Sequence, residues 1–350
     1  MKKLFWAFGL WLVSASQLVA EPVYFGRDDA PRYLHIQSAL DLASVAPLLS
    51  QFVQSFSDIR IGYEDINTKE LYQNVLLHQS NGASLIISSA MDLQLKLVND
   101  GFARAYRSSQ TLQLPSFAKW RDHLFAFSFE PVVMVLNKAA FASYSYPKDR
   151  QGLLAYVRQQ GEAIRGKIGT YDIRQSGVGY LLASQDARQA DTTWGRLLEA
   201  FGSHSVRTYC CTSEMIDDVA QGRLVIAYNL LGSYAAQRVR EDDRLVMVLP
   251  KDYTLMVMRT LLIPVNAPNV EDAGLFIDFI LSRASQQAMA REGLLYPVNS
   301  EVSEQTDNLT LPPGPTRSIE LDQQLLVGRD LLKQRRFIES WETALELGVE

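Results

Sequence analysis

The stretch LFAFSFEPVVMVLNKAAF, residues 124–141, is a long run of β-forming residues interrupted by Pro131. A typical strand has about 5–6 residues, so this run is too long for one ordinary strand. A second such run, YTLMVMRTLLIPVNAP, occupies residues 253–268. A complete series of strand-like and helix-like segments lies between the two runs. We therefore expect one domain to be inserted into another, with crossing strands near Pro131 and near residues 256–262.

The chain on either side of these runs alternates between short apolar stretches and stretches with apolar residues at helical spacing. This order predicts an α/β fold in which helices cover parallel sheets. Residues 300–317 are rich in Ser, Glu, Asn and Pro and predict a linker, and residues 319–346 predict an amphipathic helical tail. The expected strands are 33–39, 59–66, 83–90, 167–172, 206–211, 223–229 and 244–250, and the expected helices are 41–56, 68–79, 91–100, 192–202, 213–222 (capped by Ser213), 270–283 and 285–293, with one more from about Ser176.

The N-terminus has the three parts of a secretory signal peptide. Lys2 and Lys3 precede an apolar run that ends at Val13, and small residues follow. The run is shorter than the roughly 20 apolar residues that a membrane span needs. We expect cleavage after Ala20 and a location in the periplasm. A cut after Ser16 and an uncleaved signal anchor are the alternatives.

The composition argues against two classes of partner. Loss of Lys2 and Lys3 with the signal peptide leaves 32 basic and 39 acidic residues, a formal net charge of −7. No basic stripe points to nucleic acid, and no later apolar run is long enough to cross a bilayer. An acidic exported chain must recognise its ligand through locally oriented groups. We expect a monomer.

The two cysteines, Cys210 and Cys211, are adjacent. A disulfide between neighbours requires a strained ring, because ordinary bridges hold their Cα atoms further apart than one peptide link allows. We therefore expect a pair of thiols at the end of a strand. A redox or metal role has little support, since no CxxC spacing accompanies the pair.

Each catalytic or nucleotide motif fails at a named residue. Residues 161–167 match a phosphate loop, but Ile168 stands where Ser or Thr would hold magnesium, and the segment precedes a strand. Gly177 and Gly179 begin a dinucleotide fingerprint, but Leu182 occupies the third glycine position. No G-x-S-x-G elbow occurs, and the four histidines lack metal-ligand spacing. We expect no enzymatic activity, no cofactor and no metal site.

Small polar residues recur where the expected strands end, which makes them candidates for a binding site. Ligands of open parallel sheets bind beyond the carboxyl ends of the strands. A helix that opens at Ser176 favours an anion at its N-terminus, and glycines there let backbone N–H groups approach it. Helix capping is the alternative role for any single serine. The candidates are Ser38, Ser88, Ser89, Ser176, Gly177, Val178, Gly179, Tyr228, Asn229, Ser233 and Tyr234.

Five segments together resemble one known family: SLIISSAMD (84–92), FEPVVMVLNK (129–138), IGTYDIRQSGVGY (168–180), AYNLLGSYA (227–235) and the stretch 263–298, which ends in Tyr-Pro-Val. Through them, almost all of residues 31–300 resembles the type II periplasmic solute-binding proteins of ABC importers, above all the branch with binders of ferric iron, phosphoglycerate and hexose phosphate. The terminal segment with Trp341 is similar to a tail of members linked to sensor kinases.

The resemblance implies two Rossmann-like α/β lobes, joined by two hinge strands, that close over a ligand in the cleft between them. It divides the chain into a signal peptide (1–20), a discontinuous first lobe (21–130 plus 257–300), a second lobe (131–256), and a linker with a helical tail (301–350).

The resemblance also implies the partner, and the helix start at Ser176–Gly179 favours an anion as the ligand. We expect a small anionic solute, an organic phosphate or a carboxylate, that is delivered to an inner-membrane ABC permease. A receptor that presents the solute to a sensor kinase is the alternative, and an exported enzyme is a third. Ferric-iron binders of this family carry two adjacent tyrosines, whereas five residues separate Tyr228 from Tyr234 here. We therefore expect an anion site rather than an iron site.

Overall fold

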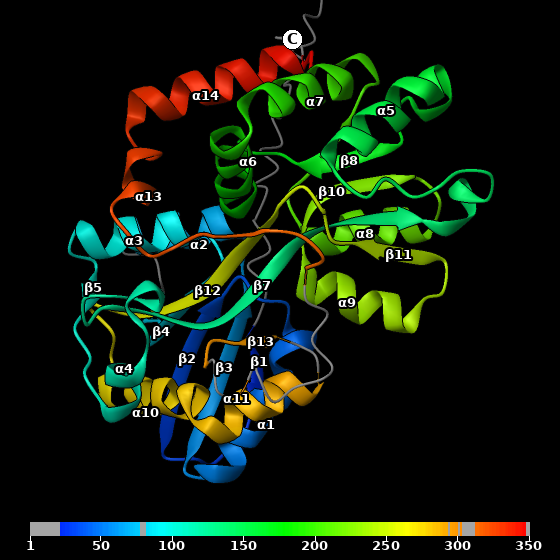
Figure 1. Ribbon diagram of the computed structural model, residues 1–350. Coiled ribbons are helices and arrows are strands. Elements are labelled where there is room, and N and C mark those ends of the chain that lie inside the picture. Colours follow the sequence, from blue (N-terminus) through cyan, green and yellow to red (C-terminus); the bar gives the residue numbers. More distant parts are fainter. Residues whose placement is uncertain (1–21, 78–81, 293–294, 300–301, 303–311, 348–350) are drawn as a thin grey trace, which may run out of the picture.

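The computed structural model describes residues 22–77, 82–292, 295–299, 302 and 312–347, which form two α/β lobes (Figure 1). The expected signal peptide and much of the expected linker lie outside these residues. Within the described ranges, no helix combines the length and apolar character that a bilayer crossing requires. The α/β fold class with two lobes is as the sequence predicts.

The first lobe repeats a strand–helix unit three times. Its strands pair in parallel, and a short strand adds to the edge of the sheet antiparallel. The strands are β1 (Val23–Phe25), β2 (Arg32–Ser38), β3 (Ile59–Asp65) and β4 (Leu85–Ser88), and the helices are α1 (Leu42–Ser55), α2 (Thr68–Leu76) and α3 (Met91–Asn99).

Two long strands connect the lobes, as the two overlong runs predict. β7 (Leu124–Asn137) and β12 (Thr254–Pro264) pair antiparallel, and Pro131 lies opposite Met256. Beyond Pro131, β7 pairs instead with β10 (Ile226–Leu231) and β11 (Leu245–Val248). A 14-residue strand is therefore possible because β7 belongs to the sheets of both lobes. The lobe boundaries at 130–131 and 256–257 stay a prediction.

The second lobe continues the sheet in the order β7, β10, β8, β9. β8 (Ile168–Tyr171) lies parallel to both β10 and β9 (Arg207–Tyr209). A helix begins next to Ser176 after β8, as predicted, and Ser176 caps it, which is the alternative role considered for this serine. Ser213 is not a cap, because its helix begins one residue earlier than predicted. The helices of this lobe are α5 (Arg150–Gln160), α6 (Gly177–Gln189), α7 (Asp191–Ser203), α8 (Thr212–Ala220) and α9 (Gly232–Glu241).

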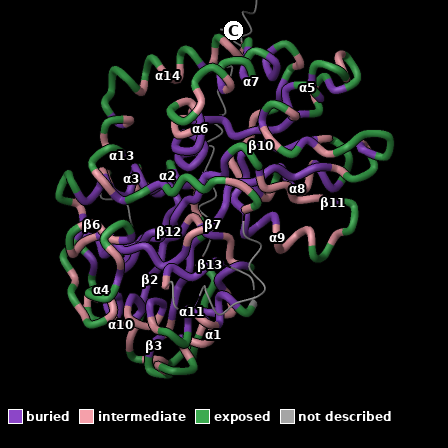
Figure 2. Tube along the Cα trace, viewed as in Figure 1, coloured by how far each residue is buried: buried purple, intermediate pink, exposed green. Residues whose placement is uncertain are grey.

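The crossing between the lobes is tightly packed and contains a buried ion pair. A Cβ on Gly232 would lie 2.6 Å from the carbonyl oxygen of Pro131, so only glycine fits there. Arg259 Nε on β12 lies 2.8 Å from Glu130 Oε1 on β7, and both side chains are fully buried. Every residue of β4, β8, β10 and β12 is buried (Figure 2).

The C-terminal tail contacts both lobes (Figure 1). β14 (Thr316–Ser318), which begins within the last two residues of the expected linker, pairs with β12. α13 (Gln324–Val327) packs on α3, and α14 (Leu331–Ala344) packs on α7, where Trp341 is buried. The remaining elements are β5 (Ala103–Arg104), α4 (Ser109–Gln113), β6 (Lys119–Trp120), α10 (Val270–Leu281), α11 (Arg283–Glu292), β13 (Tyr296–Pro297) and short 3₁₀ turns at Ser116–Ala118, Lys138–Phe141 and Gly161–Ile164.

Candidate ligand-binding cleft

A small cavity of about 80 Å³, called the cleft here, lies between the two lobes. Its lining residues follow or end β2, β3, β4, β8, β9 and β10, so the carboxyl ends of strands from both lobes meet there. This is the edge at which parallel sheets bind ligands. The lining consists of Ala39, Asp41, Asp65, Ile66, Asn67, Thr68 and Ser89 from the first lobe, and Tyr171, Val178, Cys210, Cys211, Thr212, Leu231 and Tyr234 from the second.

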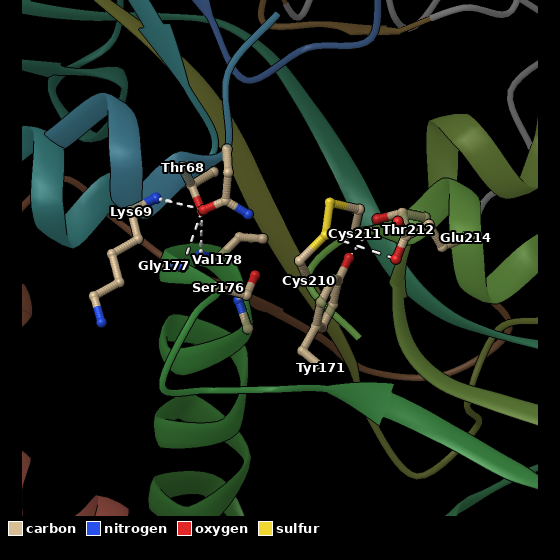
Figure 3. The surroundings of a disulfide bond; sticks show 12 residues. Thr68, Lys69, Tyr171, Ser176, Gly177, Val178, Cys210, Cys211, Thr212 and Glu214 are labelled. Atoms are coloured by element: carbon tan, nitrogen blue, oxygen red, sulfur yellow. Dashed lines mark hydrogen bonds between the residues drawn. A yellow bond between two sulfur atoms is a disulfide. The ribbon is translucent and has the colours of Figure 1, made fainter. Parts of the chain in front are cut away.

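Of the predicted residues at the amino end of α6, Val178 lines this cleft, whereas Ser176 and Gly177 line a neighbouring cavity. Protein oxygens accept the first N–H groups of the helix. Thr68 Oγ1, from the other lobe, accepts from the N–H of Gly177 at 2.9 Å and of Val178 at 3.3 Å (Figure 3). Ser176 Oγ accepts from the N–H of Gly179 at 3.2 Å. A ligand oxygen can therefore reach the Gly177 and Val178 amides only by replacing Thr68.

The two glycines of this turn are also required by packing. A Cβ on Gly177 would lie 2.6 Å from Leu93 Cδ1, and one on Gly179 would lie 2.4 Å from Tyr171 Cβ. Because both glycines are buried, a larger residue at either position would disturb the fold as well as any ligand. Substitution of Thr68 or of the cleft carboxylates is therefore a cleaner probe of binding.

The three serines predicted in the first lobe differ in how their hydroxyls are used. Ser38 Oγ accepts from the N–H of Leu40 and Ser88 Oγ from the N–H of Ala90, both at 3.1 Å, so each closes its own turn. Ser89 Oγ lines the cleft, is buried, and has no hydrogen-bond partner among the described residues. Ser89 therefore has a hydroxyl available for a ligand.

Tyr228 and Asn229 lie in a buried network around Asp186 and do not line the cleft. Asp186 accepts from Tyr228 at 2.7 Å and from Asn229 at 2.8 Å, and it also binds Arg150 at 2.9 Å and Tyr253 at 2.8 Å. Burial raises the pKa of Tyr228 well above its ordinary value. The assignment of these two residues as ligand contacts stays a prediction.

Ser233 and Tyr234 lie at the crossing between the lobes. The N–H and the hydroxyl of Ser233 donate to Glu130 Oε2 at 2.9 and 2.5 Å. Tyr234 lines the cleft, and its hydroxyl accepts from the N–H of Asp41 in the other lobe at 3.0 Å. Of these two predicted residues, Tyr234 is brought to the cleft, and Ser233 is used in the buried Glu130–Arg259 pair.

Two carboxylates in the cleft were missed by the sequence analysis, which considered small polar residues at the strand ends. Asp41 follows β2 and occupies the N-cap position of α1, but its side chain makes no capping hydrogen bond. Asp65 ends β3, and burial of its carboxylate, together with the nearby negative charge of Asp41, raises the pKa of Asp65 to about 6. No Lys, Arg or His occurs in the described lining, so this part of the cleft attracts hydrogen-bond donors.

The raised pKa of Asp65 predicts that Asp65→Asn stabilises the unliganded protein at neutral pH. An aspartate whose pKa is higher in the folded state than in the unfolded state destabilises the fold once it is ionised. The gain in melting temperature should be absent near pH 4, should grow as the pH rises to about 6, and should then level off. Differential scanning calorimetry of parent and variant at several pH values measures it. The exposed control Asp243→Asn should leave the melting temperature close to that of the parent. An Asp65→Asn variant that melts below the parent at pH 7 would contradict the interpretation.

Cys210 and Cys211 form a disulfide, so the prediction of free thiols is wrong. The pair lies between the end of β9 and the start of α8, where neither regular strand nor helix geometry constrains the backbone, and this permits the small ring. Both residues line the cleft, beside Thr212 and opposite Thr68 (Figure 3). The disulfide therefore forms part of the wall that a ligand would touch.

Comparison with known proteins places the chain among transport proteins. The family model described as "Bacterial extracellular solute-binding protein" matches residues 80–320. The crystal structure of the substrate-binding protein of an ABC transporter from Agrobacterium tumefaciens is 34% identical, with 94% of this chain and 100% of that one covered and a TM-score of 0.88. No match is found among curated protein sequences.

More distant structures share the fold. The periplasmic binding protein AfuA from Actinobacillus pleuropneumoniae, solved with fructose-6-phosphate, is 17% identical over 91% of this chain and 100% of that one, with a TM-score of 0.73. Iron-bound HitA from Pseudomonas aeruginosa is 13% identical, with 90% of this chain and 99% of that one covered and a TM-score of 0.69. The neighbours of this fold therefore include proteins with different ligands.

Proposed function

Because the chain belongs to the bacterial extracellular solute-binding proteins, we propose that it captures a small anionic solute between its two lobes and delivers it to the membrane permease of an ABC importer. The observation that carries the proposal is the cleft, which is lined by strand ends of both lobes. Hydrogen bonds from Asp41 to Tyr234 and from Gly177 to Thr68 join its two walls. Such contacts exist only while the lobes are together, so a solute that adds to them favours the closed state.

The two walls of the cleft suggest the chemistry of the solute. The amino end of α6 supplies N–H donors and the positive end of a helix dipole, which suit a phosphate or carboxylate that replaces Thr68. The carboxylates of Asp41 and Asp65 accept hydrogen bonds, and the hydroxyl of Ser89 is unused. We therefore propose a solute with an anionic group at one end and hydroxyl or amino groups at the other. Phosphorylated sugars, such as the fructose-6-phosphate in the AfuA structure, combine these groups.

A thermal-shift screen of the purified protein tests this function. A ligand that binds only the folded state stabilises it by about 2.7 kcal/mol at a hundredfold excess over its dissociation constant, which raises the melting temperature measurably. Sugar phosphates, other organic phosphates, and di- and tricarboxylates form the panel, with matched uncharged sugars as controls. We expect a shift from a hydroxylated anion and none from its uncharged counterpart. An increase in melting temperature with the uncharged sugars but not with the anions would contradict the proposal that the solute is an anion.

We expect that the protein does not bind ferric iron through the phenolates of Tyr228 or Tyr234. Tyr228 is buried in the Asp186 network, and burial also raises the pKa of Tyr234, which makes both phenols poor sources of phenolate. Protein mixed with ferric citrate should therefore lack the visible absorption band of an iron–tyrosinate complex. A strong band that disappears in Tyr234→Phe would favour an iron-binding function instead.

A further inference from the structure

A second cavity, of about 320 Å³, lies between the two lobes and the C-terminal tail, and we call it the tail cavity. Residues of α2, α3, α6 and the tail segment 329–338 line it. Lys69 contributes to this cavity, whereas its neighbour Thr68 lines the cleft. In Figure 3, Lys69 points away from the disulfide, on the other side of the amino end of α6. The tail cavity is thus distinct from the cleft.

All the charged side chains in the described lining of the tail cavity are positive. No carboxylate occurs among its described lining residues, although it has four cationic side chains. Three of these cations pair with carboxylates outside the lining: Lys96 with Asp100, Arg174 with Asp172 and Glu342, and Arg329 with Asp92. Lys69 Nζ donates to the carbonyl oxygen of Arg174. The described lining itself therefore adds no negative charge beside these donors. The cationic residues are Lys69, Lys96, Arg174 and Arg329.

Arg329 is the residue that points most directly to a ligand. It is only 9% exposed, its Nε lies 2.7 Å from Asp92 Oδ2 on α3, and its guanidinium lies 4.4 Å from the ring centre of Tyr180 on α6. Its Nη2 is buried and has no hydrogen-bond partner among the described residues. A buried charged donor without an acceptor costs about 1–3 kcal/mol or more, so an acceptor in this cavity would be stabilising.

The amino end of α6 adds to this preference through its dipole alone, because Thr68 and Ser176 accept its first N–H groups. Ser176 and Gly177 also line the tail cavity, and α6 has 13 residues, enough for a helix dipole whose positive end favours anions. Guanidinium groups bind phosphate and carboxylate oxygens through paired N–H donors. We propose that the tail cavity binds a small oxyanion, a phosphate or a carboxylate, which links the C-terminal tail to both lobes.

Calorimetric titration of the full chain with inorganic phosphate, at constant ionic strength, tests this proposal. The double variant Lys69→Gln with Lys96→Gln removes two charges from residues that are not fully buried, so it should fold as the parent does, which circular dichroism checks. We expect saturable binding to the parent and at least about tenfold weaker binding to this variant. The matched control, Lys138→Gln with Lys148→Gln, makes the same charge change outside the lining and should bind as the parent does.

Two results would overturn the proposal. One is the absence of saturable phosphate binding to the parent. The other is equal affinity in the parent and in the Lys69/Lys96 variant, which would place the phosphate elsewhere. Solute binding in the cleft is tested by the thermal-shift screen, and oxyanion binding in the tail cavity is tested by calorimetry of the lysine variants. The two proposals can therefore fail independently of each other.

Discussion

Replacement of Asp186 by alanine is expected to lower the free energy of unfolding by about 3–5 kcal/mol. Its carboxylate is 1% exposed and accepts from Tyr228, Asn229 and Tyr253, as well as from the buried Arg150. The variant would leave the buried Arg150 guanidinium with the partly exposed Asp252 as its remaining carboxylate partner, and the loss of the buried counter-charge accounts for most of the effect. Urea unfolding followed by circular dichroism measures it.

Asp217→Ala in the same lobe is the matched control. Asp217 pairs with Arg238 at 2.6 Å, but both side chains are about half exposed, at 45% and 40%. Exposed ion pairs contribute at most about 1 kcal/mol, so this variant should be close to the parent. Equal losses for Asp186→Ala and Asp217→Ala would show that the buried network does not stabilise the lobe.

Joint replacement of Asp41 and Asp65 by asparagine is expected to weaken binding of the solute found in the screen at least about a hundredfold. Hydrogen bonds to a charged group are worth about 1.5–3 kcal/mol each, and a factor of ten corresponds to about 1.4 kcal/mol. Both carboxylates line the cleft, where the described lining holds no cation. Calorimetric titration of parent and variant measures the change.

A control with the same charge change is Asp28→Asn with Asp243→Asn, two exposed carboxylates outside the lining. Its affinity should match that of the parent. The single variant Asp65→Asn should bind more weakly even though it is expected to be more stable without solute. A double variant of Asp41 and Asp65 that binds as tightly as the parent would mean that the solute does not touch this wall.

The two-lobe fold could be predicted because strand length carries information about connectivity. A run as long as 124–141 is too long for one ordinary strand of a small sheet, and β7 indeed pairs with β12 up to Pro131 and with β10 from Val132 onward. The tail could be predicted only in part. Its helical periodicity was recognisable, but its break between α13 and α14 and its contacts with both lobes depend on tertiary packing.

The site was harder to predict from the sequence, because a hydroxyl at a strand end has several possible uses. Ser38 and Ser88 each bind an N–H two residues on, whereas Ser89 is left without a partner among the described residues. Nothing local to Ser176 and Gly177 indicates that Thr68, 109 residues earlier, accepts from the Gly177 N–H. The Cys210–Cys211 bond was missed for a similar reason, since it depends on a turn conformation that composition does not reveal.

Small-angle X-ray scattering of the full chain, with and without the solute found in the screen, tests most directly the claim that the lobes close over a ligand. The account predicts a smaller radius of gyration at saturating solute. The double variant of Asp41 and Asp65, at the same solute concentration, should keep the value of the unliganded protein. An unchanged radius of gyration in the parent, under conditions where calorimetry shows full occupancy, would contradict closure of the lobes.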